Sequence, residues 1–254
     1  MEPKTGRSYV AELVGTFLLV FFICMVVSLT SREALGFTDW AVIGLVHALV
    51  LSLLVAALAG VCGAHFNPAV TIALAAMRKI RGGDAGVYIL MQLVGATLAA
   101  LAVKAVIEDE GKPVNFGATL ISKAFLAGNF NGMVLELIGT FTLMLAIAGT
   151  AIIARNKSDL TPWIIGGTLG MAVMCIGPLT GAGLNPARAF GPMLVAGVLD
   201  NNFGQWLVVY TIGPIIGALI AVWLVRYFYP DDIEEAEAIT APREDILEVP
   251  AEGI

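Results

Sequence analysis

The stretch that decides the fold occurs twice: Gly63-Ala64-His65-Phe66-Asn67-Pro68-Ala69 and, 118 positions later, Gly181-Ala182-Gly183-Leu184-Asn185-Pro186-Ala187. Asparagine is a favoured N-cap and proline a favoured first helical residue, so each copy predicts the start of a helix. The helices are expected over residues 69–77, before the basic, glycine-rich residues 78–83, and over residues 187 to about 198.

Both predicted helices are shorter than the roughly 20 residues that cross a bilayer, yet each directly follows a long apolar run. Non-helical backbone at membrane depth is tolerated only where it lines a watery cavity or is buried in protein. Two short helices that begin there therefore predict a pore.

The composition places the chain in a membrane. Of its 254 residues, 58% are hydrophobic and 13% are charged, and the mean hydropathy is +0.88. These values exclude an ordinary soluble domain and predict an all-α protein with several membrane spans.

The net charge of −6 comes mainly from the C-terminal end. Residues 231–254 hold nine acidic side chains against Arg243 alone, a net charge of −8 for this stretch. With little apolar content, residues 231–254 are expected to form a disordered cytoplasmic tail. Residues 1–230 are expected to form a single transmembrane channel domain. The acidic residues of the tail are Asp231, Asp232, Glu234, Glu235, Glu237, Glu244, Asp245, Glu248 and Glu252.

Six full-length spans are predicted, and the two short helices follow the second and the fifth. The first span lies behind Lys4 and Arg7 and is too long for a signal-peptide core, so we expect it to be retained. The spans cover Tyr9–Leu29, Trp40–Ala59, Ala85–Ile107, Met133–Ile153, Pro162–Ile176 and Gly204–Phe228.

The chain repeats itself in two halves, about 8–107 and 131–228. Residues 11–17 recur as residues 135–141 at an offset of 124, and Tyr88 recurs as Tyr210 at an offset of 122. An odd number of spans per half inverts the second half relative to the first. The two short helices are therefore expected to enter from opposite faces and to meet N-terminus to N-terminus.

Basic residues are distributed unevenly between the predicted faces, with nine on the side of the termini and four on the other. The positive-inside bias then places both termini in the cytoplasm. Arg188 belongs to neither face, and an arginine inside a membrane is a functional-site candidate by default. The nine are Lys4, Arg7, Arg78, Lys79, Arg81, Arg155, Lys157, Arg226 and Arg243, and the four are Arg32, Lys104, Lys112 and Lys123.

The predicted pore has a simple electrostatic character. Two opposed helix N-termini make the midplane positive and repel cations. The amides of Asn67 and Asn185 can donate hydrogen bonds to a passing water and so interrupt a proton-conducting wire of waters. The backbone before each asparagine is expected to form a ladder of carbonyl acceptors, from Gly63, Ala64 and His65 and from Gly181, Ala182 and Gly183.

Over residues 8–228 the sequence resembles the aquaporin and glycerol-facilitator family. The resemblance rests on residues 63–71 and 183–188, on the Glu-x-x-Gly-Thr repeat and on the internal duplication. It implies an aquaporin-like right-handed bundle of six transmembrane helices and two re-entrant half-helices. It also implies a homotetramer that conducts water and small neutral solutes such as ammonia, hydrogen peroxide or urea. We expect the protein to lie in the plasma (cell) membrane, with no cofactor and no nucleic acid.

The resemblance assigns a role to each candidate residue. It makes Glu12 and Glu136 structural acceptors for the re-entrant loops, although buried glutamates also suit a proton-coupled carrier. It implies a tonoplast-type selectivity filter rather than that of ordinary water channels or glycerol facilitators. The paired motifs are Asn67, Pro68, Ala69 and Asn185, Pro186, Ala187, and the filter is His47, Val173, Ala182 and Arg188.

Other interpretations stay open. A glycerol-type facilitator is the nearest, and a secondary transporter is more distant, because inverted repeats with broken helices also build carriers. His47 can instead bond a backbone carbonyl and stay out of the pore, and His65 is expected to orient its loop and shape the cytoplasmic vestibule. No nucleophile, base and orienting partner converge in the sequence, so no enzyme and no metal site are predicted, and Cys24, Cys62 and Cys175 are treated as small hydrophobes.

Overall fold

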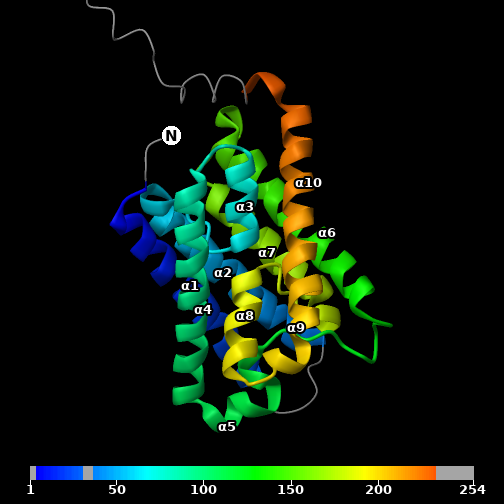
Figure 1. The fold of residues 1–254 in the computed structure, drawn as a ribbon. Coiled ribbons are helices and arrows are strands. Elements are labelled where there is room, and N and C mark those ends of the chain that lie inside the picture. The colour runs from blue at the N-terminus through cyan, green and yellow to red at the C-terminus, as the bar shows by residue number, and fades with distance from the viewer. Residues whose placement is uncertain (1–3, 31–36, 233–254) are drawn as a thin grey trace, which may run out of the picture.

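The computed structural model describes residues 4–30 and 37–232. Residues 233–254, most of the tail expected to be disordered, lie outside the described residues. Lys4 and Asp232, the ends of the described chain, lie at the same end of the molecule, which we call the terminal face (Figure 1). The opposite end, at the short helix α5 (Glu108–Gly111), is called the distal face.

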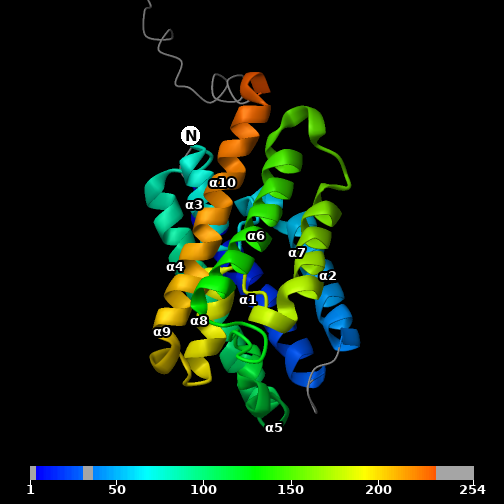
Figure 2. The same ribbon diagram turned by 90° about the vertical axis from the view of Figure 1, so that its right-hand side faces the viewer.

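Six helical spans are long and apolar enough to cross a membrane, which confirms the predicted fold class. They run alternately between the terminal and distal faces (Figures 1 and 2). Two of them contain a π-helical turn, η2 (Ala148–Ile152) after α6 and η4 (Val208–Ile212) before α10. The helices are α1 (Gly6–Thr30), α2 (Phe37–Cys62), α4 (Gly82–Val106), α6 (Asn129–Ile147), α7 (Thr161–Thr180) and α9 (Leu199–Leu207) continuing through η4 into α10 (Gly213–Phe228).

Two half-helices complete the bundle. The helix α3 (Pro68–Ala76) runs from the interior to the terminal face, and α8 (Pro186–Val195) runs from the interior to the distal face (Figure 1). Each begins at the proline of its Asn-Pro pair, with the asparagine as N-cap in extended conformation. Pro192 is a further proline inside α8.

The repeated glycines set how closely the spans pack. A Cβ atom added at Gly95 of α4 would clash with the carbonyl oxygen of Leu13 on α1, and one at Gly217 of α10 would clash with that of Leu137 on α6. The two contacts occupy matching places in the two halves. Helices inside membranes associate through close backbone approach of this kind, so the duplicated glycines fix two equivalent helix pairs.

The fifth predicted span ends too early. It was expected to stop at Ile176, but α7 continues through Pro178 to Thr180. A proline removes one helical hydrogen bond without always ending a helix, particularly where neighbouring helices support the backbone. The helix stops instead at Gly181, whose φ of 77° is left-handed.

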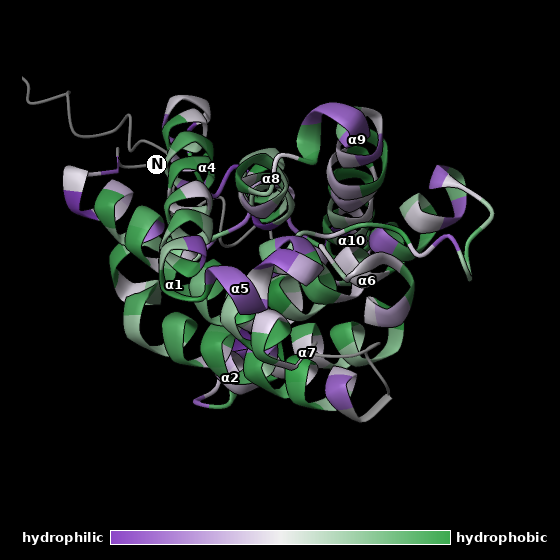
Figure 3. Cartoon of the chain, turned by 90° about the horizontal axis from the view of Figure 1, so that it is seen from below, coloured by the Kyte–Doolittle hydropathy of each residue, from purple (hydrophilic) through white to green (hydrophobic). Residues whose placement is uncertain are grey.

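The outer surface is mainly apolar along the spans. Seen from the distal face, the helix flanks are largely hydrophobic, whereas α5 and parts of the connections are hydrophilic (Figure 3). Trp163, Trp223 and Tyr227 are among the large side chains that remain exposed. This distribution suits helices that face lipid along their length and water at their ends.

Candidate functional site: a pore between two half-helices

The two re-entrant loops share an unusual backbone. Residues with left-handed φ lie one, two and four positions after the helix end in each loop, and only the first is glycine. Such conformations are uncommon for residues with a side chain and persist where surrounding bonds hold them. The φ values are 90°, 52° and 48° at Gly63, Ala64 and Phe66, and 77°, 45° and 50° at Gly181, Ala182 and Leu184.

The first loop is held by the carboxylate of Glu12, which is fully buried on α1. Its Oε1 accepts a hydrogen bond of 2.8 Å from the backbone N–H of His65, and its Oε2 accepts one of 2.8 Å from that of Phe66. Gln92 of α4 donates a third bond of 2.8 Å to Oε2. A buried carboxylate with three donors compensates the backbone groups that the loop leaves without helical partners.

The second loop is held in the same way by Glu136 of α6. The backbone N–H groups of Gly183 and Leu184 donate to its Oε1 at 2.9 Å and its Oε2 at 2.6 Å. Here the third donor is the hydroxyl of Thr180, at 2.6 Å, instead of a glutamine. The two acids therefore make equivalent contacts with the two loops.

A pair of tyrosines secures the point where each long helix stops. The hydroxyl of Tyr88 donates to the carbonyl oxygen of Cys62 at 2.7 Å, and the hydroxyl of Tyr210 donates to that of Thr180 at 2.6 Å. All four residues are buried. The sequence showed the tyrosine repeat, but this role was not predicted, because it depends on contact between distant segments.

Asn67 makes two kinds of bond. Its Oδ1 accepts from the backbone N–H of Ala69 at 2.9 Å, which caps α3. Its Nδ2 donates to the carbonyl oxygen of Leu184 in the other re-entrant loop at 2.8 Å. The asparagine therefore connects the two halves of the chain.

Asn185 repeats this arrangement from the other side. Its Oδ1 accepts from the N–H groups of Ala187 at 3.0 Å and Arg188 at 3.2 Å, and its Nδ2 donates to the carbonyl of Phe66 at 2.8 Å. An amide nitrogen carries two hydrogens, so each asparagine retains one N–H after the bond to the opposite loop. Both asparagines line the same cavity.

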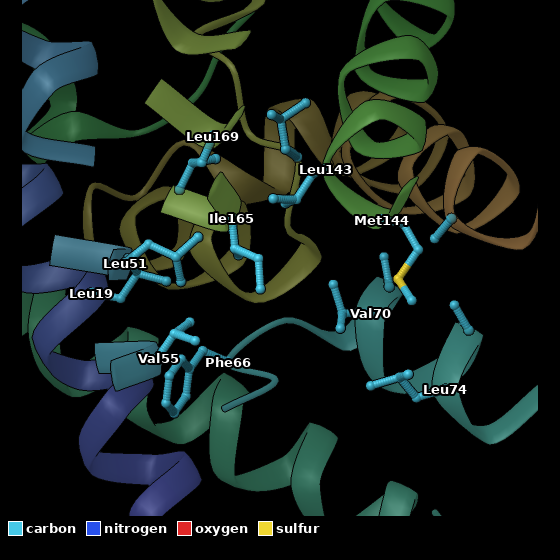
Figure 4. Packing of buried hydrophobic residues seen from close by; sticks show 14 of the residues in the cluster. Leu19, Leu51, Val55, Phe66, Val70, Leu74, Leu143, Met144, Ile165 and Leu169 are labelled. Atoms are coloured by element: carbon cyan, nitrogen blue, oxygen red, sulfur yellow. The ribbon is translucent and has the colours of Figure 1, made fainter. Parts of the chain in front are cut away.

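That cavity, of about 270 Å³, opens toward the terminal face and is called the terminal cavity. Its wall is mostly aliphatic, and Figure 4 shows side chains from α1, α2, α3, α6 and α7 around a common space. The polar side chains that line it are those of His47, His65, Asn67, Thr161, Asn185 and Arg188. The aliphatic lining includes Leu19, Leu51, Val55, Val70, Leu74, Leu143, Ile165 and Leu169.

His47 of α2 lines the deep end of this cavity. Its Nδ1 lies 2.7 Å from the carbonyl oxygen of Ile43, so Nδ1 carries the hydrogen of that bond. The other ring nitrogen, Nε2, is buried and has no protein partner among the described residues. In a neutral ring Nε2 is then an acceptor. His47 therefore bonds a backbone carbonyl and also lines the cavity, whereas the sequence interpretation treated these as alternatives.

Arg188 separates the terminal cavity from a second one. Its side chain is 3% exposed and lines both the terminal cavity and a space of about 200 Å³ on the distal side. Nη1 donates to the carbonyl oxygen of Gly117 at 2.8 Å. Nε is buried and lacks a partner within the described part of the chain.

Two residues of the expected filter are placed differently from the others. Val173 and Ala182 are 0% and 1% exposed, and neither contributes to the wall of the two cavities. His47 and Arg188 do line the terminal cavity. The structure therefore brings one polar pair to the cavity surface and leaves the small apolar pair enclosed.

The carbonyl-ladder residues are divided between the cavities. Gly63, Ala64, His65 and Gly183 line the terminal cavity, and Gly181 lines the distal one. The Nδ1 of His65 lies 3.2 Å from the hydroxyl of Thr71, and its ring meets Tyr88 edge-on at 5.1 Å between centroids.

The cysteines are free in the structure, with Cys24 and Cys62 buried and Cys175 exposed. Cys62 has more than a packing role, because its Sγ accepts a bond of 3.3 Å from the N–H of Ala64. The matching position, Thr180, accepts from Ala182 at 3.1 Å. These contacts fix the first turn of each re-entrant loop.

Sequence reasoning missed the connection that reaches Arg188. The turn η1 (Lys112–Gly117) contacts α1. Left-handed φ values occur in it at Asn115, Phe116 and Gly117. Asparagine and glycine tolerate this conformation, so Asn115-x-Gly117 was a usable indication of a tight turn. Nothing local showed that the carbonyl of Gly117 would bond the guanidinium.

Two opposed half-helices, capped by asparagines that line a membrane-embedded cavity, define a membrane channel built from an inverted repeat. The Major intrinsic protein family matches residues 1–225, and the chain belongs to this family. Members of the family are channels and not enzymes.

Two relatives and one solved structure show how far the likeness extends. The chain is 37% identical to "Probable aquaporin AqpM" of Archaeoglobus fulgidus over 244 residues, 89% of this chain and 98% of the relative. It is 33% identical to "Glycerol uptake facilitator protein-like 6" of Lactiplantibacillus plantarum over 228 residues, 89% of this chain and all of the relative. The aquaglyceroporin structure from Plasmodium falciparum shares the fold, with a TM-score of 0.72 at 22% identity, over 92% of this chain and 98% of that one.

Proposed function

We propose that this channel passes water and small neutral solutes passively and excludes ions and protons. The observation that carries the proposal is the pair of asparagines: Asn67 and Asn185 each donate one Nδ2 hydrogen to the opposite loop and keep the other beside the cavity. A water between them accepts from both amides. Its own hydrogens then point away from the midplane, which interrupts proton transfer along the file.

Charge exclusion has two sources in this proposal. The N-termini of α3 and α8 face the interior, and each carries about half a positive charge. Arg188 adds a permanent positive charge, because a guanidinium stays protonated. A water molecule loses hydrogen-bond partners as it enters the narrow passage. Backbone carbonyl oxygens replace some of these partners, and they belong to Gly63, Ala64, His65, Gly181, Ala182 and Gly183.

The solute range is proposed from the residues at the narrow region. His47 offers an acceptor and Arg188 a donor at the cavity surface, while Val173 and Ala182, which are enclosed, are small. This combination suits ammonia, hydrogen peroxide and urea in addition to water. Glycerol transport is the alternative, and it requires a continuous apolar surface for the carbon chain on one side of the filter.

The proposed setting is the plasma membrane, with both termini in the cytoplasm and four copies per assembly. Basic side chains gather on the terminal face, where Arg78, Arg81, Arg155 and Lys157 are exposed and precede or follow spans. By the positive-inside bias this face is cytoplasmic. The homotetramer follows from the family resemblance.

Stopped-flow light scattering on proteoliposomes tests the proposal. Vesicles with the protein should shrink faster than protein-free vesicles under an osmotic gradient, while a pH dye inside reports no proton leak. Flux should rise linearly with the gradient, whereas a carrier would saturate. Shrinkage equal to that of empty vesicles, or a proton current that follows water flow, would overturn it. Parallel gradients of urea, ammonium and glycerol separate the solute classes.

A further inference from the structure

The distal cavity is a second, differently built compartment, which we call the distal vestibule. It has about 200 Å³, several times the roughly 30 Å³ that one water takes in the liquid. Arg188 lies at its inner end, and the rest of the wall is mostly apolar. The wall consists of Val27, Trp40, Val114, Gly117, Ala118, Leu120, Gly177, Pro178 and Gly181.

Trp40 gives this vestibule an aromatic side. A Cβ atom added at Gly177 of α7 would run into the six-membered ring of Trp40, so the indole lies directly on the α7 backbone. Trp40 lies seven residues before His47, outside the four positions expected to form the filter. An indole held against a glycine presents a fixed apolar surface at little entropic cost.

Among the described residues that line the vestibule, Arg188 is the only charged one. Of its guanidinium nitrogens, Nη1 is bound to Gly117 and Nε is enclosed. Within residues 4–30 and 37–232, no carboxylate forms an ion pair with this side chain. A buried, unpaired positive charge beside an apolar wall is costly, and a ligand with one negative end and one apolar end would relieve that cost.

We propose that the distal vestibule binds small monocarboxylates with a short apolar chain, which plug the channel from the distal face. The carboxylate bonds the guanidinium of Arg188 through Nη2, and the hydrocarbon chain lies between Trp40, Val114 and Pro178. The block of water flow rests on the proposed water conduction. The binding itself does not.

The chemistry favours this class over other anions and over neutral solutes. Phosphate and sulfate have acceptor oxygens on all sides, and the apolar wall would leave several of them without donors. A neutral amide of the same shape keeps the apolar contact and can still accept a hydrogen bond from the guanidinium, but it loses the attraction between opposite charges, which is strong where water is excluded. Butyrate and butyramide therefore form a matched pair of probes.

The first experiment measures water flux in proteoliposomes at neutral pH with each probe at equal concentration on both sides. Butyrate should slow water flux with a saturable dose dependence. Butyramide should need about tenfold more, which corresponds to about 1.4 kcal/mol. Equal effects of the two probes, or no effect of butyrate in a channel that conducts water, would overturn the proposal.

Variants locate the site, with flux expressed relative to the uninhibited flux of the same variant. Val114→Asp puts a negative charge at the vestibule wall and should abolish inhibition by butyrate, whereas the neutral Val114→Asn should retain it. Trp40→Leu should weaken inhibition, whereas Trp223→Leu, on an exposed face of α10, should not. Inhibition that survives Val114→Asp and Trp40→Leu unchanged would place butyrate elsewhere and reject the site.

Binding is also measured without flux, by saturation-transfer NMR of butyrate with the full chain in detergent. A signal that disappears in Val114→Asp and remains in Val114→Asn supports the site even if the vesicles show no water conduction. In that case the proposed function fails and this inference stands. Fast water flux without a butyrate signal would instead support the proposed function and overturn this inference.

Discussion

The carbonyl oxygen of Gly117 accepts a hydrogen bond of 2.8 Å from the guanidinium of Arg188, 71 positions later in the chain. Gly117 belongs to the connection between the two halves, so that connection positions the charge between the two cavities. A guanidinium held at one nitrogen cannot swing freely across the passage. The selectivity of the narrow region is therefore expected to depend on the connection as well as on the half-helices.

Arg188→Val should increase cation and proton leakage more than it changes water flux. The substitution removes a permanent charge, while the dipoles of α3 and α8 remain. Proton leakage is followed with a pH dye and sodium leakage with a sodium dye in the same vesicles. Arg81→Val, at an exposed position of extended backbone on the terminal face, is the control and should leave both unchanged. Undetectable leakage in Arg188→Val would assign exclusion to the helix ends alone.

Glu12→Gln should loosen the first re-entrant loop. One of the two oxygens that accept from His65 and Phe66 becomes an NH₂ group, which faces a donor and leaves it unsatisfied, at a cost of about 1–3 kcal/mol. Hydrogen exchange at residues 63–67 should accelerate, while the second loop stays protected. Glu108→Gln, at an exposed acid of α5, should not alter exchange in either loop. Equal protection in Glu12→Gln and the native chain would remove the supporting role of this acid.

Gly217→Ala should destabilise the bundle by about 1–3 kcal/mol or more, because the new methyl group collides with the carbonyl of Leu137. Gly95→Ala should behave alike, because it meets the carbonyl of Leu13. Gly86, also on α4, has open space around it, so Gly86→Ala should be neutral or slightly stabilising. Thermal unfolding in detergent compares the three. A Gly217→Ala protein as stable as Gly86→Ala would show that the helices can move apart freely.

His47→Phe should reduce ammonia permeability relative to water permeability. The phenyl ring fills the same space but lacks the Nε2 acceptor of the histidine, which lines the terminal cavity. Val173→His should also reduce ammonia permeability, because the larger imidazole narrows the filter. Internal pH after an ammonium gradient measures the flux. Unchanged flux in both variants would mean that the constriction lies at other residues.

Much of the fold was predictable because its information is local. Asn-Pro pairs start helices whatever lies around them, and both half-helices do begin at Pro68 and Pro186. Apolar length similarly identifies a span. The end of a span is less local: α7 passes through Pro178 to Thr180, beyond the expected Ile176, because neighbouring helices can support a helix past a proline.

The candidate site was less predictable, because its decisive contacts join distant segments. The bonds from Asn67 to Leu184 and from Arg188 to Gly117 leave no periodicity in the sequence. The family resemblance proposed four filter residues, of which His47 and Arg188 line the terminal cavity while Val173 and Ala182 are enclosed. Trp40 is not one of these four residues, and its place became clear from its packing on Gly177.

The bond from Asn185 to the carbonyl of Phe66 also bears on how the channel is made. Its partners are 119 positions apart, so the first re-entrant loop emerges from the ribosome long before its acceptor carbonyl can be satisfied. At about 5–20 residues per second, that interval is about 6–24 s. During this time the first re-entrant loop lies at membrane depth beside the first three spans, and its Phe66 carbonyl lacks the hydrogen bond from Asn185. The insertion machinery, or water, must then shelter the Phe66 carbonyl until the second half arrives.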